Sequence, residues 1–127
     1  MENTRLLSEF ENTWGTYSIR LVGRLPEDVT PRPVVVYAHG LQAQKEWYQW
    51  ISECLAENGY LTLLFTVPSK NSRNPQQWSD GVKSAIDYLV TTQEGVAHSG
   101  GLGPIGAMGH SMGGLGALIA AHDNLPL

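Results

Sequence analysis

The stretch GPIGAMGHSMGG, Gly103 to Gly114, decides how the rest of the chain is interpreted. Its first half is a short apolar run typical of a buried strand, and the residues from Ser111 onward are typical of a helix. A residue at so sharp a strand-to-helix turn is held in a strained backbone conformation. Gly109 and Gly113, two positions to either side of Ser111, let the strand and the helix pass closely because they carry no Cβ.

The segments before this turn alternate between strand and helix patterns. Continuous apolar runs predict buried strands at 34–40 and 60–67, and spaced apolar residues predict helices at 45–58 and 76–92. Residues 13–25 alternate loosely between apolar and polar, as a strand or hairpin does. Strands and helices in alternation predict a parallel sheet with right-handed crossovers, to which the N-terminal strands add an antiparallel edge.

The helix patterns also predict which large side chains are buried. On the first helix the apolar stripe includes Trp47, Trp50 and Cys54, and on the second it includes Trp78. We expect the three tryptophans to pack in the core and Cys54 to be an inert buried thiol. Between the second helix and the third strand, residues 94–104 are glycine-rich and predict a loop.

Composition limits the class of protein. A chain of 127 residues fits one domain, and a net charge of -4 without a basic cluster disfavours nucleic acid as a partner. The single cysteine allows no internal disulfide and predicts no metal site. The N-terminus has no apolar core of a signal peptide, and no segment is a membrane span, so we expect a cytoplasmic protein if Met1 is the natural start and a secreted one if a signal peptide has been removed.

The turn is also suited to chemistry. It raises the Ser111 hydroxyl above the carboxyl end of the sheet, at the start of a helix whose free amides and dipole stabilise a developing oxyanion. The amide of Met112 is the expected first donor. The second is expected from the loop after strand 34–40, where Gly40 allows close approach and the amide of Leu41 points to the same oxyanion.

These two pieces, the "HG" of His39-Gly40 and the "GHSMGG" elbow, resemble the α/β-hydrolase family, in particular its lipase, polyester-hydrolase and dienelactone-hydrolase-like esterases. The likeness covers roughly Pro33 to His122, although the chain has "HGLQ" where many esterases have "HGGG". The resemblance implies an α/β, three-layer fold with a mostly parallel sheet and helices on both faces. It also implies an acid and then a histidine on strands beyond the elbow.

Only thirteen residues follow Gly114, and no histidine within the chain suits the base. We expect His39 to hold the oxyanion loop by hydrogen bonds, His110 to be structural, and His98 to be solvated at the wrong end of the sheet. His122 lies eleven residues along the helix from the serine, about 16 Å away. Residues 1–127 are therefore interpreted as a single, partial domain, whose missing C-terminal half belongs to the same polypeptide or to a second chain.

The expected function is that of a serine hydrolase that cleaves small-molecule or polymeric carboxylic esters through an acyl-enzyme on Ser111, with no metal or organic cofactor. A thioesterase or a peptidase with the same site is one alternative. A non-catalytic protein whose hydrolase-like pocket binds an ester or acyl ligand is the other.

Overall fold

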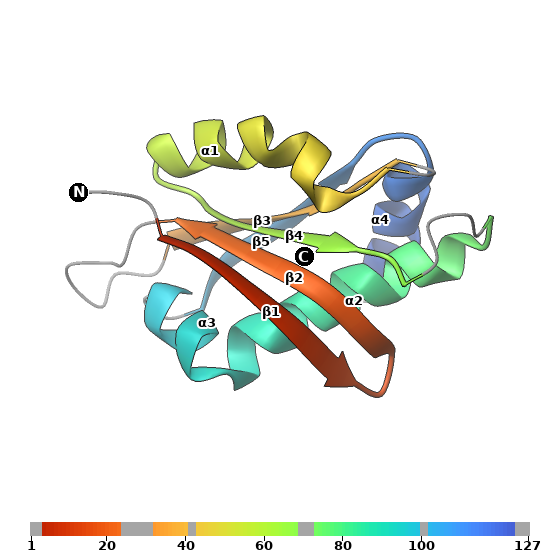
Figure 1. The fold of residues 1–127 in the computed structure, drawn as a ribbon, viewed down its shortest axis with the longest axis horizontal. Helices are drawn as coiled ribbons and strands as arrows, with labels where there is room; N and C mark the ends of the chain where they lie inside the picture. The colour runs from red at the N-terminus through yellow and green to blue at the C-terminus, as the bar shows by residue number, and fades with distance from the viewer. Residues whose placement is uncertain (1–3, 24–31, 41–42, 69–72, 100–101, 124–127) are drawn as a thin grey trace.

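A five-stranded mixed sheet in the order β1-β2-β4-β3-β5 is the middle layer of the fold (Figure 1). The computed structural model describes residues 4–23, 32–40, 43–68, 73–99 and 102–123. The strands are β1 (Thr4–Asn12), β2 (Gly15–Gly23), β3 (Arg32–Ala38), β4 (Leu61–Thr66) and β5 (Leu102–Gly109). The helices are η1 (Lys45–Tyr48), α1 (Gln49–Glu57), α2 (Pro75–Thr91), α3 (Gln93–Ser99) and α4 (Met112–His122).

The predicted parallel core with an antiparallel edge is confirmed. β3 pairs in parallel with β4 on one side and with β5 on the other, so that Val36 lies opposite Leu63 and Ala107. β2 pairs with β4 in the antiparallel sense, and β1 closes a hairpin onto β2. The hairpin begins at Thr4, nine residues before the predicted segment. Its first strand was not predicted, because Arg5, Glu9 and Glu11 interrupt the apolar pattern.

Helices cover both faces of the sheet, as predicted: α1 lies on one face, and α2, α3 and α4 lie on the other (Figure 1). The larger core forms between the sheet and the second group of helices. Its fully buried members include Ile19, Leu63, Phe65, Trp78 and Val82. A smaller core on the α1 face contains Val22, Tyr37, Ala56 and Leu64.

The second helix forms as predicted. It begins after Asn74, whose side chain accepts a hydrogen bond of 3.1 Å from the amide of Gln76, and Pro75 occupies its first turn, where no amide donor is needed. Trp78 is completely buried on the predicted stripe. Helix α2 packs against β3 and β4 and contributes side chains to the larger core.

The predicted burial on the first helix is wrong. Trp47 is 61% exposed and Trp50 is 70% exposed, and Cys54 is exposed as well. Residues 45–48 form a 3-10 turn with three residues per turn, so the helix face rotates relative to a continuous α-helical stripe. Ser52 and Ala56 are the buried residues of α1 in consequence.

The glycine-rich segment after α2 contains a helix that the sequence analysis missed. The Thr92 hydroxyl accepts a hydrogen bond of 3.1 Å from the amide of Gly95, which caps the start of α3. His98, expected to be solvated, is buried on this helix, with its Nδ1 2.7 Å from the carbonyl oxygen of Glu94. The cap stabilises a helix whose composition alone predicts a loop.

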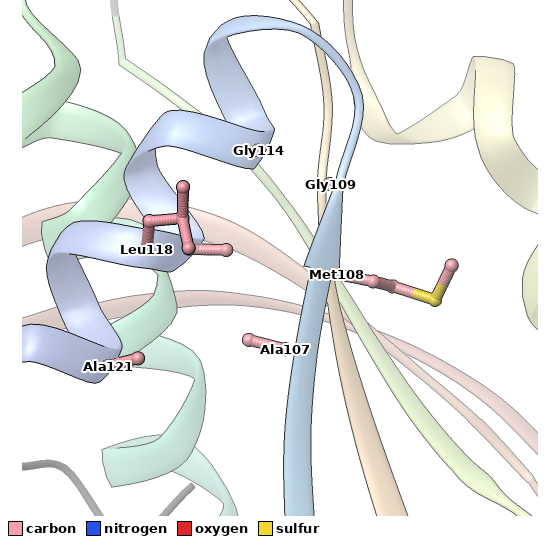
Figure 2. A pocket seen from close by; sticks show the side chains of 7 residues that line it. Ala107, Met108, Gly109, Gly114, Leu118 and Ala121 are labelled. Atoms are coloured by element: carbon pink, nitrogen blue, oxygen red, sulfur yellow. The ribbon is translucent and has the colours of Figure 1, made fainter.

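The elbow strand lies at one edge of the sheet. Within the described ranges, β5 pairs only with β3, and its other side is not covered by a strand. A hollow of about 260 Å³ opens there between β5 and α4, lined by Ala107 and by Leu118 and Ala121 of the helix, while the Met108 side chain points the other way (Figure 2). Leu118 is 70% exposed. This edge therefore presents apolar surface and unpaired backbone groups.

None of the helices formed by the described residues combines the length and the apolar character needed to cross a membrane.

Candidate functional site

Ser111 occupies a strained turn between β5 and α4. Its φ is 57° and its ψ is -117°, and it is the only non-glycine residue with a positive φ in the described part of the chain. Such a conformation costs on the order of 1–3 kcal/mol and persists only where the surrounding structure enforces it. The side chain is exposed to solvent at the start of α4. The serine is thus presented outward, as an accessible nucleophile requires.

The two elbow glycines are needed because backbone passes close to both. A Cβ at Gly109 would overlap the backbone of Gly113, and a Cβ at Gly113 would overlap the carbonyl groups of Ala38 and His39. The first contact is the strand-to-helix approach expected from the sequence. The second brings the start of α4 against the carboxyl end of β3, so Gly113 sets the distance between the elbow and the neighbouring loop.

Backbone hydrogen bonds hold the elbow in place. The amide of His110 donates to the carbonyl oxygen of Ala38 at 3.1 Å, and the amide of Gly113 donates to the carbonyl oxygen of His110 at 3.0 Å. The first bond extends the β3–β5 pairing by one residue beyond the strand, and the second closes the turn around Ser111. The elbow is consequently joined to the end of β3 by a backbone hydrogen bond.

His39 is the residue that fixes the loop after β3. It is buried, its Nε2 accepts a hydrogen bond of 3.1 Å from the amide of Val67, and its Nδ1 lies 2.7 Å from the carbonyl oxygen of Gly40. Since Nε2 is an acceptor, we assign the proton to Nδ1, which donates to Gly40. The indole of Trp78 donates to the carbonyl oxygen of His39 at 2.9 Å. Both ring nitrogens are therefore engaged in holding the loop.

The environment of His39 favours the neutral ring. Burial lowers the pKa of this histidine below its usual value, and the nearby Lys45 charge acts in the same direction. The hydrogen bond to Gly40 and the Glu46 carboxylate oppose this shift and are weaker than the effect of burial. A neutral His39 is the form that the Val67 hydrogen bond requires.

Of the two expected oxyanion donors, the structure describes only Met112. Met112 is the first residue of α4, where helix geometry gives the amide no intrahelical partner. Leu41, the other expected donor, lies outside the described residues. The amide of Gly40 just before it donates to the phenol oxygen of Tyr48 at 3.1 Å, so this amide is already occupied.

Tyr48 is a residue of the site that the sequence analysis missed. Its hydroxyl group lies 3.3 Å from Nδ1 of His110, the residue before the serine, in addition to its bond with Gly40. His110 itself is exposed on this side of the elbow. Tyr48 lies between the apolar positions of the predicted helix stripe, and no motif marked it.

The remaining histidines lie away from Ser111. His98 is on α3, which precedes β5, so it lies at the opposite end of that strand from the elbow. His122 is the last residue of α4, exposed, with Nδ1 3.7 Å from the Asp123 carboxylate. Asp123 in turn accepts a hydrogen bond of 2.7 Å from Lys83. Neither histidine is placed to receive a proton from the serine.

Two acids on α2 are half-buried and hydrogen-bonded. Asp80 accepts a bond of 2.9 Å from the side-chain amide of Gln76, and Asp87 accepts one of 2.9 Å from Asn12. Across the described ranges no three His, Cys, Asp or Glu side chains are grouped closely enough to hold a metal ion.

Comparisons with known proteins match this chain to parts of two proteins that are described as hydrolases. The bis(hydroxyethyl) terephthalate hydrolase of Streptomyces coelicolor is 35% identical over 88 residues, which are 68% of this chain and 27% of that protein. The solved dienelactone hydrolase of Anabaena variabilis superposes with a TM-score of 0.76 at 20% identity, covering 97% of this chain and 59% of the other. No family model matches the chain. The chain thus spans only part of the length of either relative.

We predict that Gly113→Ala destabilises the protein, because the added methyl group would overlap the carbonyl groups at the end of β3. Forcing a methyl group into a closely packed contact costs typically 1–3 kcal/mol. Urea denaturation followed by tryptophan fluorescence measures the change. Gly114→Ala is the matched control, since a Cβ at this position would lie 3.5 Å from its nearest neighbour, the carbonyl oxygen of Gly109, which is an ordinary contact distance. Equal unfolding midpoints for the two variants would contradict the close approach.

The lowered pKa of His39 predicts that the free energy of unfolding falls as the pH drops below about 6.5. Below this pH His39 is protonated in the unfolded chain and stays neutral in the folded protein. Proton binding therefore favours the unfolded state, and the free energy of unfolding falls by at most about 1.4 kcal/mol per pH unit. At pH 7.5 neither state is protonated and the stabilisation is complete. Denaturation midpoints at pH 7.5 and 5.5 measure this dependence.

His39→Gln is the control for this pH dependence, because glutamine retains a hydrogen-bonding side chain that does not titrate. The variant should lose less stability than the original protein between the two pH values. The same pH dependence in both proteins would show that another group is responsible.

Proposed function

We propose that this chain, which has the α/β-hydrolase fold, carries the nucleophile of a serine hydrolase that cleaves carboxylic esters. The observation that carries the proposal is the backbone of Ser111, an exposed serine held at a φ of 57° at the start of a helix. Strain of this kind is retained where function requires it. Both relatives are hydrolases, which supports the same class of reaction.

In the proposed reaction the Ser111 hydroxyl attacks the ester carbonyl and a histidine takes its proton. The amides of Met112 and Leu41 stabilise the oxyanion of the tetrahedral intermediate, supported by the dipole of α4. The intermediate collapses to an acyl-enzyme with release of the alcohol. Water then attacks the acyl group, and the carboxylic acid leaves with Ser111 regenerated.

Gly40 has a specific part in this arrangement. A Cβ at this position would come within 2.8 Å of Nδ1 of His110 and 3.3 Å of the Tyr48 hydroxyl. A side chain at this position would therefore displace the His110 ring, so glycine favours the close approach of the loop after β3 to the elbow. In the proposed site this approach serves the oxyanion hole, to which Leu41 is expected to contribute its amide.

We further propose that the acid and the base of the triad come from polypeptide outside residues 1–127. Three observations support this: His39 is engaged through both ring nitrogens, His98 lies at the far end of β5, and the free edge of β5 presents apolar surface. Both relatives are longer than this chain. A further strand on that edge would cover it and bring loops to the carboxyl end of the sheet.

The nucleophile is tested with a fluorophosphonate, which reacts at a useful rate only with an activated serine. We expect mass spectrometry of the intact, active protein to place the adduct on Ser111, and Ser111→Ala to abolish it. Labelling of the Ser111→Ala protein would contradict the assignment of Ser111 as the nucleophile. No labelling at all would favour a non-catalytic ligand-binding protein.

The origin of the acid and base is tested by comparing residues 1–127 alone with the longer, active protein. We expect no multiple-turnover hydrolysis of a short-chain nitrophenyl ester by the isolated segment, because its serine lacks a base. Steady turnover by this segment that depends on Ser111 would show that one of its own histidines is the base. Relative rates on esters, thioesters and amides separate an esterase from a thioesterase or a peptidase.

A further inference from the structure

The Tyr48 hydroxyl connects the two halves of the candidate site. It accepts a hydrogen bond of 3.1 Å from the amide of Gly40, in the loop after β3, and it lies 3.3 Å from Nδ1 of His110, in the elbow. These two partners are 70 residues apart in the sequence. A single phenol oxygen thereby contacts both the oxyanion loop and the residue preceding the serine.

The Tyr48 ring is itself held in place from two directions. Its centroid lies 4.8 Å from that of Tyr37 on β3, and it packs with the smaller core on the α1 face. The 3-10 turn that carries it is tied to β4, because the amide of Lys45 donates to the Thr66 hydroxyl at 3.1 Å. Between β3 and this turn, the amide of Ala43 donates a hydrogen bond of 3.2 Å to the carbonyl oxygen of Gly40. The hydroxyl position is therefore fixed by the fold.

The donor and acceptor capacity of a phenol determines where the protons of Tyr48 and His110 lie. Tyrosine offers one proton and accepts at its oxygen. Because the oxygen accepts from Gly40, the phenol proton is available for Nδ1 of a neutral His110, which then carries its own proton on Nε2. In this arrangement Tyr48 uses its single proton on His110 and accepts from Gly40, so both of these contacts lie within the protein.

We propose that Tyr48 is a positioning residue for the proposed ester hydrolysis: through its hydroxyl group it holds Gly40, just after β3, against His110 of the elbow. The proposal rests on the proposed function of Ser111. Tyr48 acts through Gly40 and His110 and does not touch the substrate. Oxyanion donors are effective when they are held in place before the reaction, so loss of this contact lowers the rate of the chemical step.

Tyr48→Phe in the intact, active protein is the test. The substitution removes the hydroxyl group and keeps the ring that packs on Tyr37. We expect kcat for a short-chain nitrophenyl ester to fall by about tenfold, less than the hundredfold or more that follows loss of an oxyanion donor, with KM unchanged. The rate at which a fluorophosphonate modifies Ser111 should fall in parallel.

Tyr37→Phe is the matched control, because it makes the same change in the neighbouring ring and leaves the Tyr48 hydroxyl in place. We expect its kcat to be unchanged. Thermal unfolding of both variants checks that each is folded at the assay temperature. A Tyr48→Phe protein with normal kcat, or one with a raised KM and a normal kcat, overturns the proposal, and the second result would place Tyr48 in contact with substrate.

A double-mutant cycle with His110→Ala separates the two hydrogen bonds and does not depend on one variant alone. His110→Ala leaves the bond from Gly40 to Tyr48 in place, so we expect it to lower kcat less than Tyr48→Phe does. Tyr48→Phe should still lower kcat in the His110→Ala protein. No further loss in that background would overturn the assigned role of the Gly40 bond.

The same measurements distinguish failure of this inference from failure of the proposed function. If the unmodified protein forms the Ser111 adduct and Tyr48→Phe forms it equally fast, Ser111 remains the nucleophile and the positioning role is rejected. If the unmodified protein forms no adduct, the proposed function fails and the inference falls with it.

Discussion

The strained backbone of Ser111 is the constraint on which the rest of the site depends. A serine at a φ of 57° and a ψ of -117° is held there only because the strand before it and the helix after it are both fixed. The strand is fixed by pairing with β3, and the helix is fixed by the contact of Gly113 with the end of that strand. The free energy that maintains the strain comes from the buried core beneath the sheet, where Trp78 and the β3 and β4 side chains pack.

The same contacts place the second half of the site. β3 ends where α4 begins, so the His39-Gly40 loop necessarily runs beside the elbow. Buried His39 ties this loop to Val67 at the end of β4, and Tyr48 ties it to the elbow. The segments that follow β3, β4 and β5 are thus linked to one another at the carboxyl ends of these strands, which is where open α/β sheets bind their ligands.

Much of this arrangement follows from the sequence because strong local signals agree with the global fold. The apolar runs of β3 and β4, the Asn74-Pro75 start of α2 and the elbow glycines each predict one element with little ambiguity. The exposure of Trp47 and Trp50 was not predictable from periodicity, since a 3-10 turn changes the helical register. Tyr48 was missed because its role arises from tertiary contacts with Gly40 and His110, which leave no local pattern.

We propose that this strained serine forms a covalent acyl-enzyme. The most direct test of this proposal is to mix the intact, active protein with a nitrophenyl ester, quench with acid within a few turnovers, and determine the mass of the peptide that contains Ser111. We expect one acyl group on that residue, formed with the first burst of nitrophenol and lost at the steady-state rate of turnover. Ester hydrolysis in which an acyl group accumulates on a different residue would contradict it.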